Sequence, residues 1–163
     1  MTKLLVLSDS HRNVSAMVQA CRLEKPDRII HLGDHFKDAL ELQRQFPDIP
    51  LDAVRGNCDF EREPEEKLIL VDGKKIFLCH GHQYHVKESY LSLEYAAREK
   101  GADIVLFGHT HRILEEQHNH LFMLNPGSIG APRYPGKFSY GLVLIEQGQI
   151  FLQTQILRTD FTL

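Results

Sequence analysis

Short apolar runs that alternate with amphipathic segments are the feature that most constrains how this chain folds. In the first third, apolar runs at 4–7, 28–32 and 51–54 are separated by two helix-like segments, 14–21 and 37–46. The first of these segments repeats its apolar residues at helical spacing, which is typical of a helix lying on a sheet. This β-α-β-α-β order predicts a parallel sheet with right-handed crossovers.

The rest of the chain follows a different pattern. The runs 68–71 and 76–79 are joined by Asp72-Gly73, which is a strong hairpin signal. We expect a helix next, with four residues on its apolar face: Val86, Tyr90, Leu93 and Ala97. Further short strands are expected at 103–107, 113–116, 121–124, 140–146 and 150–157. The pattern predicts an α/β fold in which two mixed sheets stack between helices.

Composition indicates one globular domain over residues 1–163. The chain is 42 % hydrophobic and 25 % charged, as in ordinary globular domains. Its net charge of −3 provides no basic excess for nucleic acid, and its apolar runs are far shorter than the ~20 residues of a membrane span. Three cysteines without CxxC spacing argue against a disulfide framework. We expect a cytoplasmic protein that binds neither membranes nor nucleic acid.

Polar clusters follow five of the strand-like runs. These clusters are Asp9-Ser10-His11, Gly33-Asp34, Gly56-Asn57-Cys58-Asp59, His80-Gly81-His82 and Gly108-His109-Thr110-His111. In α/β sheets the ligand crevice lies beyond the carboxyl ends of the strands, so these side chains are expected to converge. Carboxylate, imidazole and amide groups suit Mn²⁺, Fe²⁺, Zn²⁺, Co²⁺ or Ni²⁺. Seven of these side chains are candidate metal ligands, as named below. That number is too many for one tetrahedral ion and suits two ions that share a carboxylate.

The order of these blocks, DxH, GD, GNxD, H and GHxH, resembles that of the calcineurin-like metallophosphoesterases. The short length and the later Asn125-Pro126-Gly127-Ser128 are similar to the small single-domain prokaryotic phosphodiesterases of that superfamily. The resemblance implies a four-layer α/β/β/α sandwich of two mixed β-sheets flanked by helices. It also implies a dinuclear, metal-dependent phosphoric diester hydrolase, in which a hydroxide that bridges the metals attacks phosphorus.

The same resemblance assigns the ligands of two divalent ions, with Mn²⁺ as the first expectation. Asp9, His11 and His111 are expected at the first ion. Asn57, His80 and His109 are expected at the second, and Asp34 is expected to bridge both.

The third block departs from the family pattern, in which it usually reads GNHD or GNHE. Cys58 occupies the histidine position here, and a thiol is a weaker hydrogen-bond donor than an imidazolium. Cys58 and Asp59 are catalytic candidates, although Cys58 can also be a small packing residue and Asp59 can simply close a turn. If Cys58 weakens protonation of the leaving group, diesters with acidic leaving groups should be hydrolysed best.

Two arginines are candidate substrate contacts. Arg12 follows the first block directly, and Arg133 lies beyond the Asn125–Ser128 segment. A guanidinium group can bind two phosphate oxygens at once, although either residue can also be an ordinary surface arginine.

The expected partner is a small phosphodiester substrate, and a homo-oligomer is expected by analogy with relatives of this size. Two other functions stay open. A phosphomonoesterase or phosphatase of the same superfamily would generally carry the histidine that Cys58 replaces. A non-catalytic protein-binding scaffold with this fold would lack a histidine of the metal set, whereas all seven positions are filled here.

Overall fold

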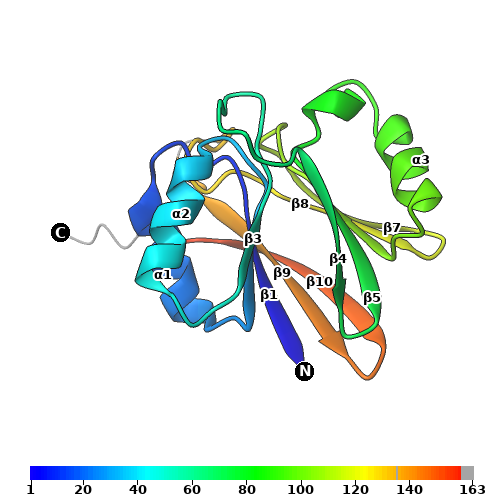
Figure 1. The fold of residues 1–163 in the computed structure, drawn as a ribbon, viewed down its shortest axis with the longest axis horizontal. Coiled ribbons are helices and arrows are strands. Elements are labelled where there is room, and N and C mark those ends of the chain that lie inside the picture. Colours follow the sequence, from blue (N-terminus) through cyan, green and yellow to red (C-terminus); the bar gives the residue numbers. More distant parts are fainter. Residues whose placement is uncertain (135, 159–163) are drawn as a thin grey trace.

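Two five-stranded sheets stack face to face in residues 1–134 and 136–158, the part of the chain that the computed structural model describes (Figure 1). In spatial order, the first sheet consists of β10 (Gln149–Ile156), β9 (Ser139–Glu146), β1 (Thr2–Leu7), β2 (Arg28–His31) and β3 (Leu51–Ala53). β1, β2 and β3 are parallel, whereas β9 and β10 are antiparallel to their neighbours. The parallel half confirms the predicted β-α-β-α-β order.

The second sheet is also mixed. In spatial order it consists of β4 (Glu66–Val71), β5 (Lys74–Cys79), β6 (Ile104–Leu106), β8 (Leu121–Pro126) and β7 (Ile113–His118). The predicted hairpin is β4–β5, and both turn residues have positive φ, 49° at Asp72 and 79° at Gly73, as a type I′ turn requires. β5, β6 and β8 are parallel, so their carboxyl ends point the same way.

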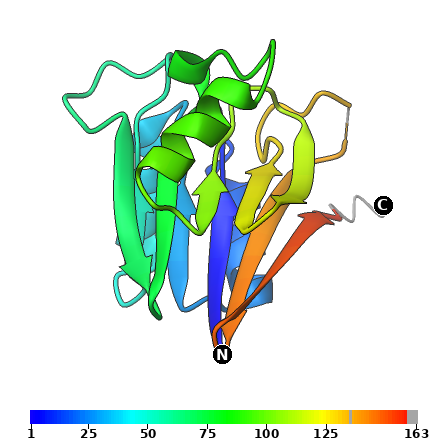
Figure 2. The ribbon, with the colours of Figure 1, turned by 90° about the vertical axis from the view of Figure 1, so that its right-hand side faces the viewer.

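Helices cover the outer face of each sheet. α1 (Val14–Glu24) and α2 (Phe36–Gln45) lie on the first sheet, and α3 (Leu91–Glu99) lies on the second (Figures 1 and 2). This arrangement confirms the four-layer α/β/β/α sandwich. In the described part of the chain, none of the helices has the length and apolarity needed to cross a membrane.

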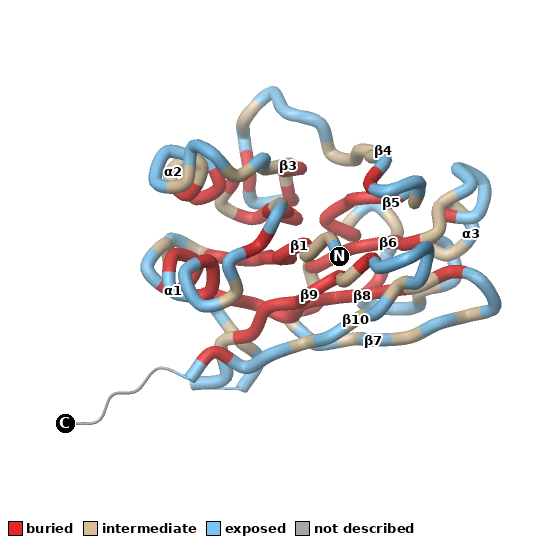
Figure 3. Tube along the Cα trace, turned by 90° about the horizontal axis from the view of Figure 1, so that it is seen from below, coloured by how far each residue is buried: buried red, intermediate tan, exposed pale blue. Residues whose placement is uncertain are grey.

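Alternating side chains of the central strands fill the three interfaces between these layers. Leu4 and Val6 of β1 belong to the apolar cluster between the two sheets, whereas Leu5 and Leu7 belong to the cluster under α1 and α2. All four residues are fully buried. Figure 3 shows that most of the buried chain lies in the central strands of the two sheets. Burying a leucine side chain contributes about 1.5–3 kcal/mol, so strand β1 stabilises both interfaces and fixes the position of the loop that follows it.

The helix predicted around Val86–Ala97 begins later than the sequence suggests. α3 starts only at Leu91, and a short 3₁₀ helix (His82–Tyr84) precedes it. Residues 85–88 form a turn instead, in which the N–H of Glu88 donates to the carbonyl of His85 at 2.9 Å and His85 has a φ of 52°. Val86 therefore lies in a turn, yet it still packs in the same apolar cluster as Leu93 and Ala97.

Candidate metal centre

The predicted metal ligands follow the carboxyl ends of parallel strands in both sheets. Asp9 and His11 follow β1, and Asp34 follows β2. His80 and the pair His109 and His111 follow β5 and β6 in the other sheet. The two sheets meet here, because Asp9 Oδ1 lies 3.7 Å from His80 Nε2.

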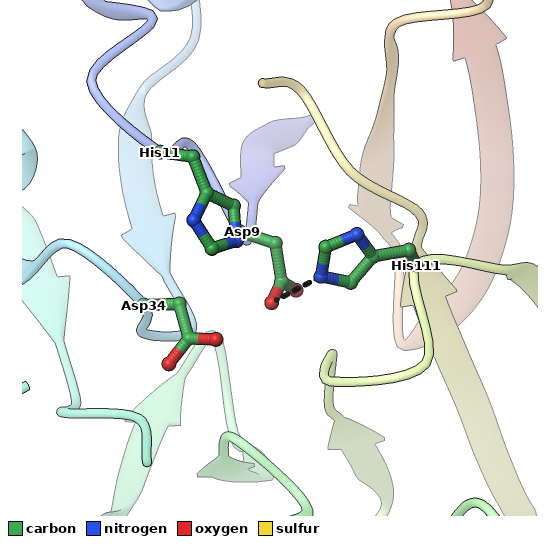
Figure 4. A group of neighbouring side chains, drawn as sticks. All are labelled: Asp9, His11, Asp34 and His111. Atoms are coloured by element: carbon green, nitrogen blue, oxygen red, sulfur yellow. Dashed lines mark ion pairs between the residues drawn. The ribbon is translucent and has the colours of Figure 1, made fainter. Parts of the chain in front are cut away.

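Four of the predicted ligands form one close group. Asp9, His11, Asp34 and His111 each offer a ligand atom, and these atoms lie within 4.8 Å of one another (Figure 4). The shortest ion-pair contact in the group joins His111 Nε2 and Asp9 Oδ1 at 3.1 Å. Two carboxylates and two imidazoles at this spacing can surround one divalent ion.

Two further histidines adjoin the same carboxylates. His80 Nε2 lies 3.4 Å from Asp34 Oδ2, and the rings of His80 and His109 have centroids 5.1 Å apart. The backbone N–H of His109 donates a hydrogen bond to Asp9 Oδ2 at 3.1 Å. Asp34 thus belongs to the first group and also adjoins His80, a position that suits a bridging carboxylate.

Three of these ligand atoms are buried without a hydrogen-bond partner among the described residues. They are Asp9 Oδ1, His11 Nε2 and His80 Nε2. The approach of His111 Nε2 to Asp9 Oδ1 is an ion-pair contact and lacks hydrogen-bond geometry. An unpaired buried polar atom costs about 1–3 kcal/mol, and a bound cation would remove that cost. The donor set therefore fits divalent metal ions.

Backbone carbonyls fix the orientation of two of the imidazole rings. His80 Nδ1 lies 2.8 Å from the carbonyl of Leu32, and His111 Nδ1 lies 2.6 Å from the carbonyl of Ala131. A carbonyl only accepts hydrogen bonds, so each Nδ1 must carry the proton. In each ring the second nitrogen, Nε2, faces the carboxylates, as in other metal-binding histidines. Although burial opposes it, the contact with Asp34 raises the pKa of His80, and the contact with Asp9 raises that of His111, so a metal ion would replace a proton at Nε2.

Burial and neighbouring charges set the pKa values of these groups. Burial by itself would raise the pKa of Asp9, but side-chain contacts and the charge of His80 outweigh it and lower that pKa. A similar balance lowers the pKa of Asp34. Burial lowers the pKa of His109 to about 4, and the charges of His80 and Lys87 act in the same direction. Ionised carboxylates and neutral imidazole are the forms that bind metal.

Backbone strain is concentrated at the same positions. Five of the seven predicted ligands have positive φ: Asp9 (53°), His11 (42°), Asp34 (59°), His109 (70°) and His111 (59°). A residue other than glycine rarely adopts this conformation, at a cost of the order of 1 kcal/mol or more each. Such strain persists where the surrounding structure imposes it, which is typical of a functional site.

Comparison with known proteins identifies the family of this chain. A family model described as the calcineurin-like phosphoesterase superfamily domain matches residues 2–148. The chain belongs to this superfamily. It is 35 % identical over 147 residues to the probable metallophosphoesterase YsnB of Bacillus subtilis, covering 88 % of this chain and 84 % of that protein. It is 33 % identical over 101 residues to the phosphodiesterase YfcE of Escherichia coli, covering 56 % of this chain and 50 % of that one.

Solved structures have the same fold. A predicted phosphoesterase from Streptococcus pneumoniae has a TM-score of 0.82 at 28 % identity, covering 95 % of this chain and 89 % of that one. Vps29 from Chaetomium thermophilum has a TM-score of 0.78 at 21 % identity, covering 99 % of this chain and 91 % of that one. At that lower identity, the likeness shows the fold alone.

Asp59, predicted as a catalytic candidate of this phosphoesterase, contacts backbone rather than the open centre. It is buried, and its carboxylate accepts four backbone N–H hydrogen bonds, from Asp34, His35, Phe36 and Gly56, at 2.7–3.0 Å. Asp59 therefore holds the Asp34 loop and the first residues of α2 in place. This contact set is that of a positioning residue, and a direct role of Asp59 in the reaction stays a prediction.

Cys58 and Asn57 lie on the exposed side of the same loop. The backbone N–H of Cys58 donates to Asp34 Oδ1 at 3.0 Å, so this residue helps to fix Asp34 through its main chain. Burial, followed by the charge of Asp34, raises the pKa of the Cys58 thiol. The Asn57 amide nitrogen lies 3.7 Å from Cys58 Sγ. The catalytic role of Cys58 and the ligand role of Asn57 stay predictions.

The two arginines predicted as substrate contacts are both exposed, in different surroundings. The backbone N–H of Arg12 donates to Asp38 Oδ2 at 2.7 Å, which fixes the main chain after His11. Arg133 lines a hollow together with Thr110, the residue between His109 and His111. The structure thus places Arg133 beside the centre, and a substrate contact by either arginine stays a prediction.

A buried network that the sequence analysis missed supports the first block. Ser10 Oγ lies 2.9 Å from His31 Nε2 and donates to Asp38 Oδ2 at 2.6 Å, and the N–H of Gly33 donates to His31 Nδ1. Burial lowers the pKa of His31 to about 4, so this ring is neutral. The network joins residues 21 to 28 positions apart in the chain, and no local spacing could reveal it.

Asn125 and Ser128 support the centre from the second sheet. Asn125 is the penultimate residue of β8, and its amide donates to the carbonyl of Gly108 and to Thr110 Oγ1, both at 3.0 Å. Ser128 Oγ donates to the carbonyl of Asp9 at 2.7 Å. The sequence singles out the Asn-Pro-Gly-Ser segment, but only these contacts show that it stabilises two ligand loops, one with Asp9 and one with His109 and His111.

Proposed function

We propose that this calcineurin-like phosphoesterase is a dinuclear, metal-dependent phosphodiesterase. The observation that carries the proposal is the convergence of three buried, unpaired ligand atoms, Asp9 Oδ1, His11 Nε2 and His80 Nε2, from loops of both sheets. The name of the relative YfcE, a phosphodiesterase, supports the diester assignment.

The residues would divide between two divalent ions. Asp9, His11 and His111 would hold one, and His80, His109 and Asn57 the other, with Asp34 shared between them. When bound, two such ions lower the pKa of a water molecule and neutralise charge that develops on the phosphoryl oxygens. We propose that both ions are Mn²⁺ when the protein turns over substrate, since this mixed nitrogen and oxygen donor set suits Mn²⁺.

The chain itself orients the centre before any substrate arrives. Hydrogen bonds from His109 N–H to Asp9 and from Cys58 N–H to Asp34 hold the two carboxylates in place. The Nδ1 contacts of His80 and His111 do the same for the imidazoles. Such preorganisation matters because a displaced ligand must otherwise be reorganised during the reaction.

Cys58 is the reason to propose a diester with an acidic leaving group. The raised pKa keeps its thiol protonated at neutral pH, but a thiol is a weak donor to a leaving oxygen. An aryl alcohol leaves as a stable anion and needs little help, whereas an alkyl alcohol needs a proton.

The test is hydrolysis of bis(p-nitrophenyl) phosphate and of p-nitrophenyl phosphate by the purified protein, first after chelation and then with Mn²⁺. We expect turnover to return with the metal and to favour the diester. Asp34→Asn should lower diester turnover by at least about 100-fold, because it removes the shared carboxylate charge. Asp48→Asn, which changes an exposed aspartate, is the matched control.

Two results would contradict the proposal. Faster turnover of the monoester would indicate a phosphomonoesterase of the same superfamily. Absence of diester turnover with Mn²⁺, Ni²⁺, Co²⁺ and Zn²⁺ alike would favour a non-catalytic binding role for this fold.

A further inference from the structure

A cationic hollow adjoins the candidate metal centre. It has a volume of about 230 Å³ and is lined by Val86, Lys87, Tyr90, Thr110, Arg112 and Arg133. Thr110 lies between the predicted ligands His109 and His111, so the hollow opens directly beside the metal-binding loop. Its volume is below the roughly 300–1,000 Å³ of pockets that enclose whole ligands, so it suits one small group of a larger molecule.

The charge of the hollow is one-sided. Three of its six lining residues are cations, Lys87, Arg112 and Arg133, and none is acidic. In residues 1–134 and 136–158, none of these three cations forms an ion pair. Other arginines of the chain are paired, for example Arg28 with Asp52. Unpaired cations gathered in one concavity raise the local concentration of anions.

Hydrogen bonds attach the hollow to the metal-binding loop. Thr110 Oγ1 accepts from the backbone N–H of Arg112 at 3.1 Å and from the Asn125 amide at 3.0 Å. His111 Nδ1 donates to the carbonyl of Ala131, two residues before Arg133. The backbones that carry both arginines are therefore fixed relative to the candidate ligands.

We propose that this hollow binds a terminal phosphate group carried by one of the two alcohol arms of the diester substrate. A terminal phosphate is close to a dianion at neutral pH, and guanidinium groups bind its oxygens in pairs. The inference rests on the proposed phosphodiesterase activity and adds a substrate class to it. Water would add across one P–O ester bond of the diester, giving an alcohol and a phosphomonoester, while the terminal phosphate in the hollow stays intact.

The test compares two probes that differ only in that phosphate: thymidine 5′-(p-nitrophenyl phosphate) and its 3′-phosphorylated derivative. With Mn²⁺ bound, we expect kcat/KM to be at least about tenfold higher for the phosphorylated probe, which corresponds to one charge-assisted hydrogen bond. Lys87→Gln and Arg112→Gln should each reduce this ratio, and the double variant should reduce it further. Arg22→Gln removes an exposed arginine on α1 and should leave the ratio unchanged.

Calorimetric binding of thymidine 3′,5′-bisphosphate and thymidine 5′-monophosphate separates this inference from the proposed function. If no diester is hydrolysed, the proposed function fails, and tighter binding of the bisphosphate by wild type than by Lys87→Gln/Arg112→Gln would still support an anion site. If diesters are hydrolysed but the two probes are turned over equally well, the inference is wrong and the proposed function stands. Equal affinity of wild type for both nucleotides would also overturn the inference.

Discussion

Replacing Asp59 with asparagine should destabilise the fold strongly, because this carboxylate holds the N-terminus of α2. Its Oδ1 accepts from the N–H groups of His35 and Phe36, and its Oδ2 accepts from those of Asp34 and Gly56. His35, at the N-cap position of α2, makes no capping hydrogen bond with its own side chain. Asp59 thus supplies the missing cap from another loop, and its negative charge faces the positive end of the helix dipole.

The size of the effect follows from this geometry. An asparagine keeps one acceptor oxygen and turns the other into an NH₂ donor that faces two N–H groups. Each hydrogen bond to a charged acceptor contributes about 1.5–3 kcal/mol, so the loss of two predicts a destabilisation of about 3–6 kcal/mol. That is a large share of the 5–15 kcal/mol that is typical of a whole domain.

Urea unfolding of the metal-free protein would measure this loss. The chain contains no tryptophan, so far-UV circular dichroism is the suitable signal. Asp48→Asn, at an exposed position, should change the free energy of unfolding by no more than about 0.5 kcal/mol. A loss below about 1 kcal/mol in Asp59→Asn would refute the capping argument, and reduced diester turnover at unchanged stability would instead indicate a catalytic role.

Three further substitutions test other parts of the structure. Burial lowers the pKa of His31 from 6.5 to about 4, so the stabilising contribution of the neutral ring is complete above pH 6.5 and is lost as the pH falls toward 4. Between pH 6.5 and 4, the free energy of unfolding measured in urea should fall by about 3 kcal/mol more in wild type than in His31→Gln. Equal falls in the two proteins would contradict this prediction. Gly108→Ala would place a Cβ 2.0 Å from Ser8 Oγ and 2.7 Å from Asp9 Oδ2, and so displace the Asp9 carboxylate. Titration should show an affinity for Mn²⁺ that is lower by about tenfold or more. An unchanged affinity would show that Asp9 does not need this space to bind the metal. Cys58→His should raise turnover of a diester with an alkyl leaving group by at least about tenfold in a steady-state assay, and no increase would end the leaving-group account.

The fold was predictable from the sequence because its signals are local. Residues 4–7 are all apolar, and successive side chains of a strand point to opposite faces. Leu4 and Val6 therefore lie on one face of β1 and Leu5 and Leu7 on the other, and the structure buries both faces. The order of the five polar blocks was equally visible, since each block directly follows a strand. The exception is the late start of α3, because residues 85–88 form a turn that no periodicity reveals.

The supports of the candidate centre were not predictable in the same way. Asp59 acts on backbone groups 23 to 25 residues away, and Asn125 acts on Gly108 across 17 residues. Aspartate and asparagine are also common turn residues, so their local sequence gives no separate signal. Only the three-dimensional structure shows which of these polar residues face the metal-binding region and which form hydrogen bonds with the backbone of the loops around it.

The number of Mn²⁺ ions bound per chain, measured by calorimetric titration of the metal-depleted protein, tests the central claim most directly. A centre divided by the shared carboxylate of Asp34 predicts two ions per chain in wild type and fewer than two in Asp34→Asn. One ion or none in wild type would contradict a dinuclear centre.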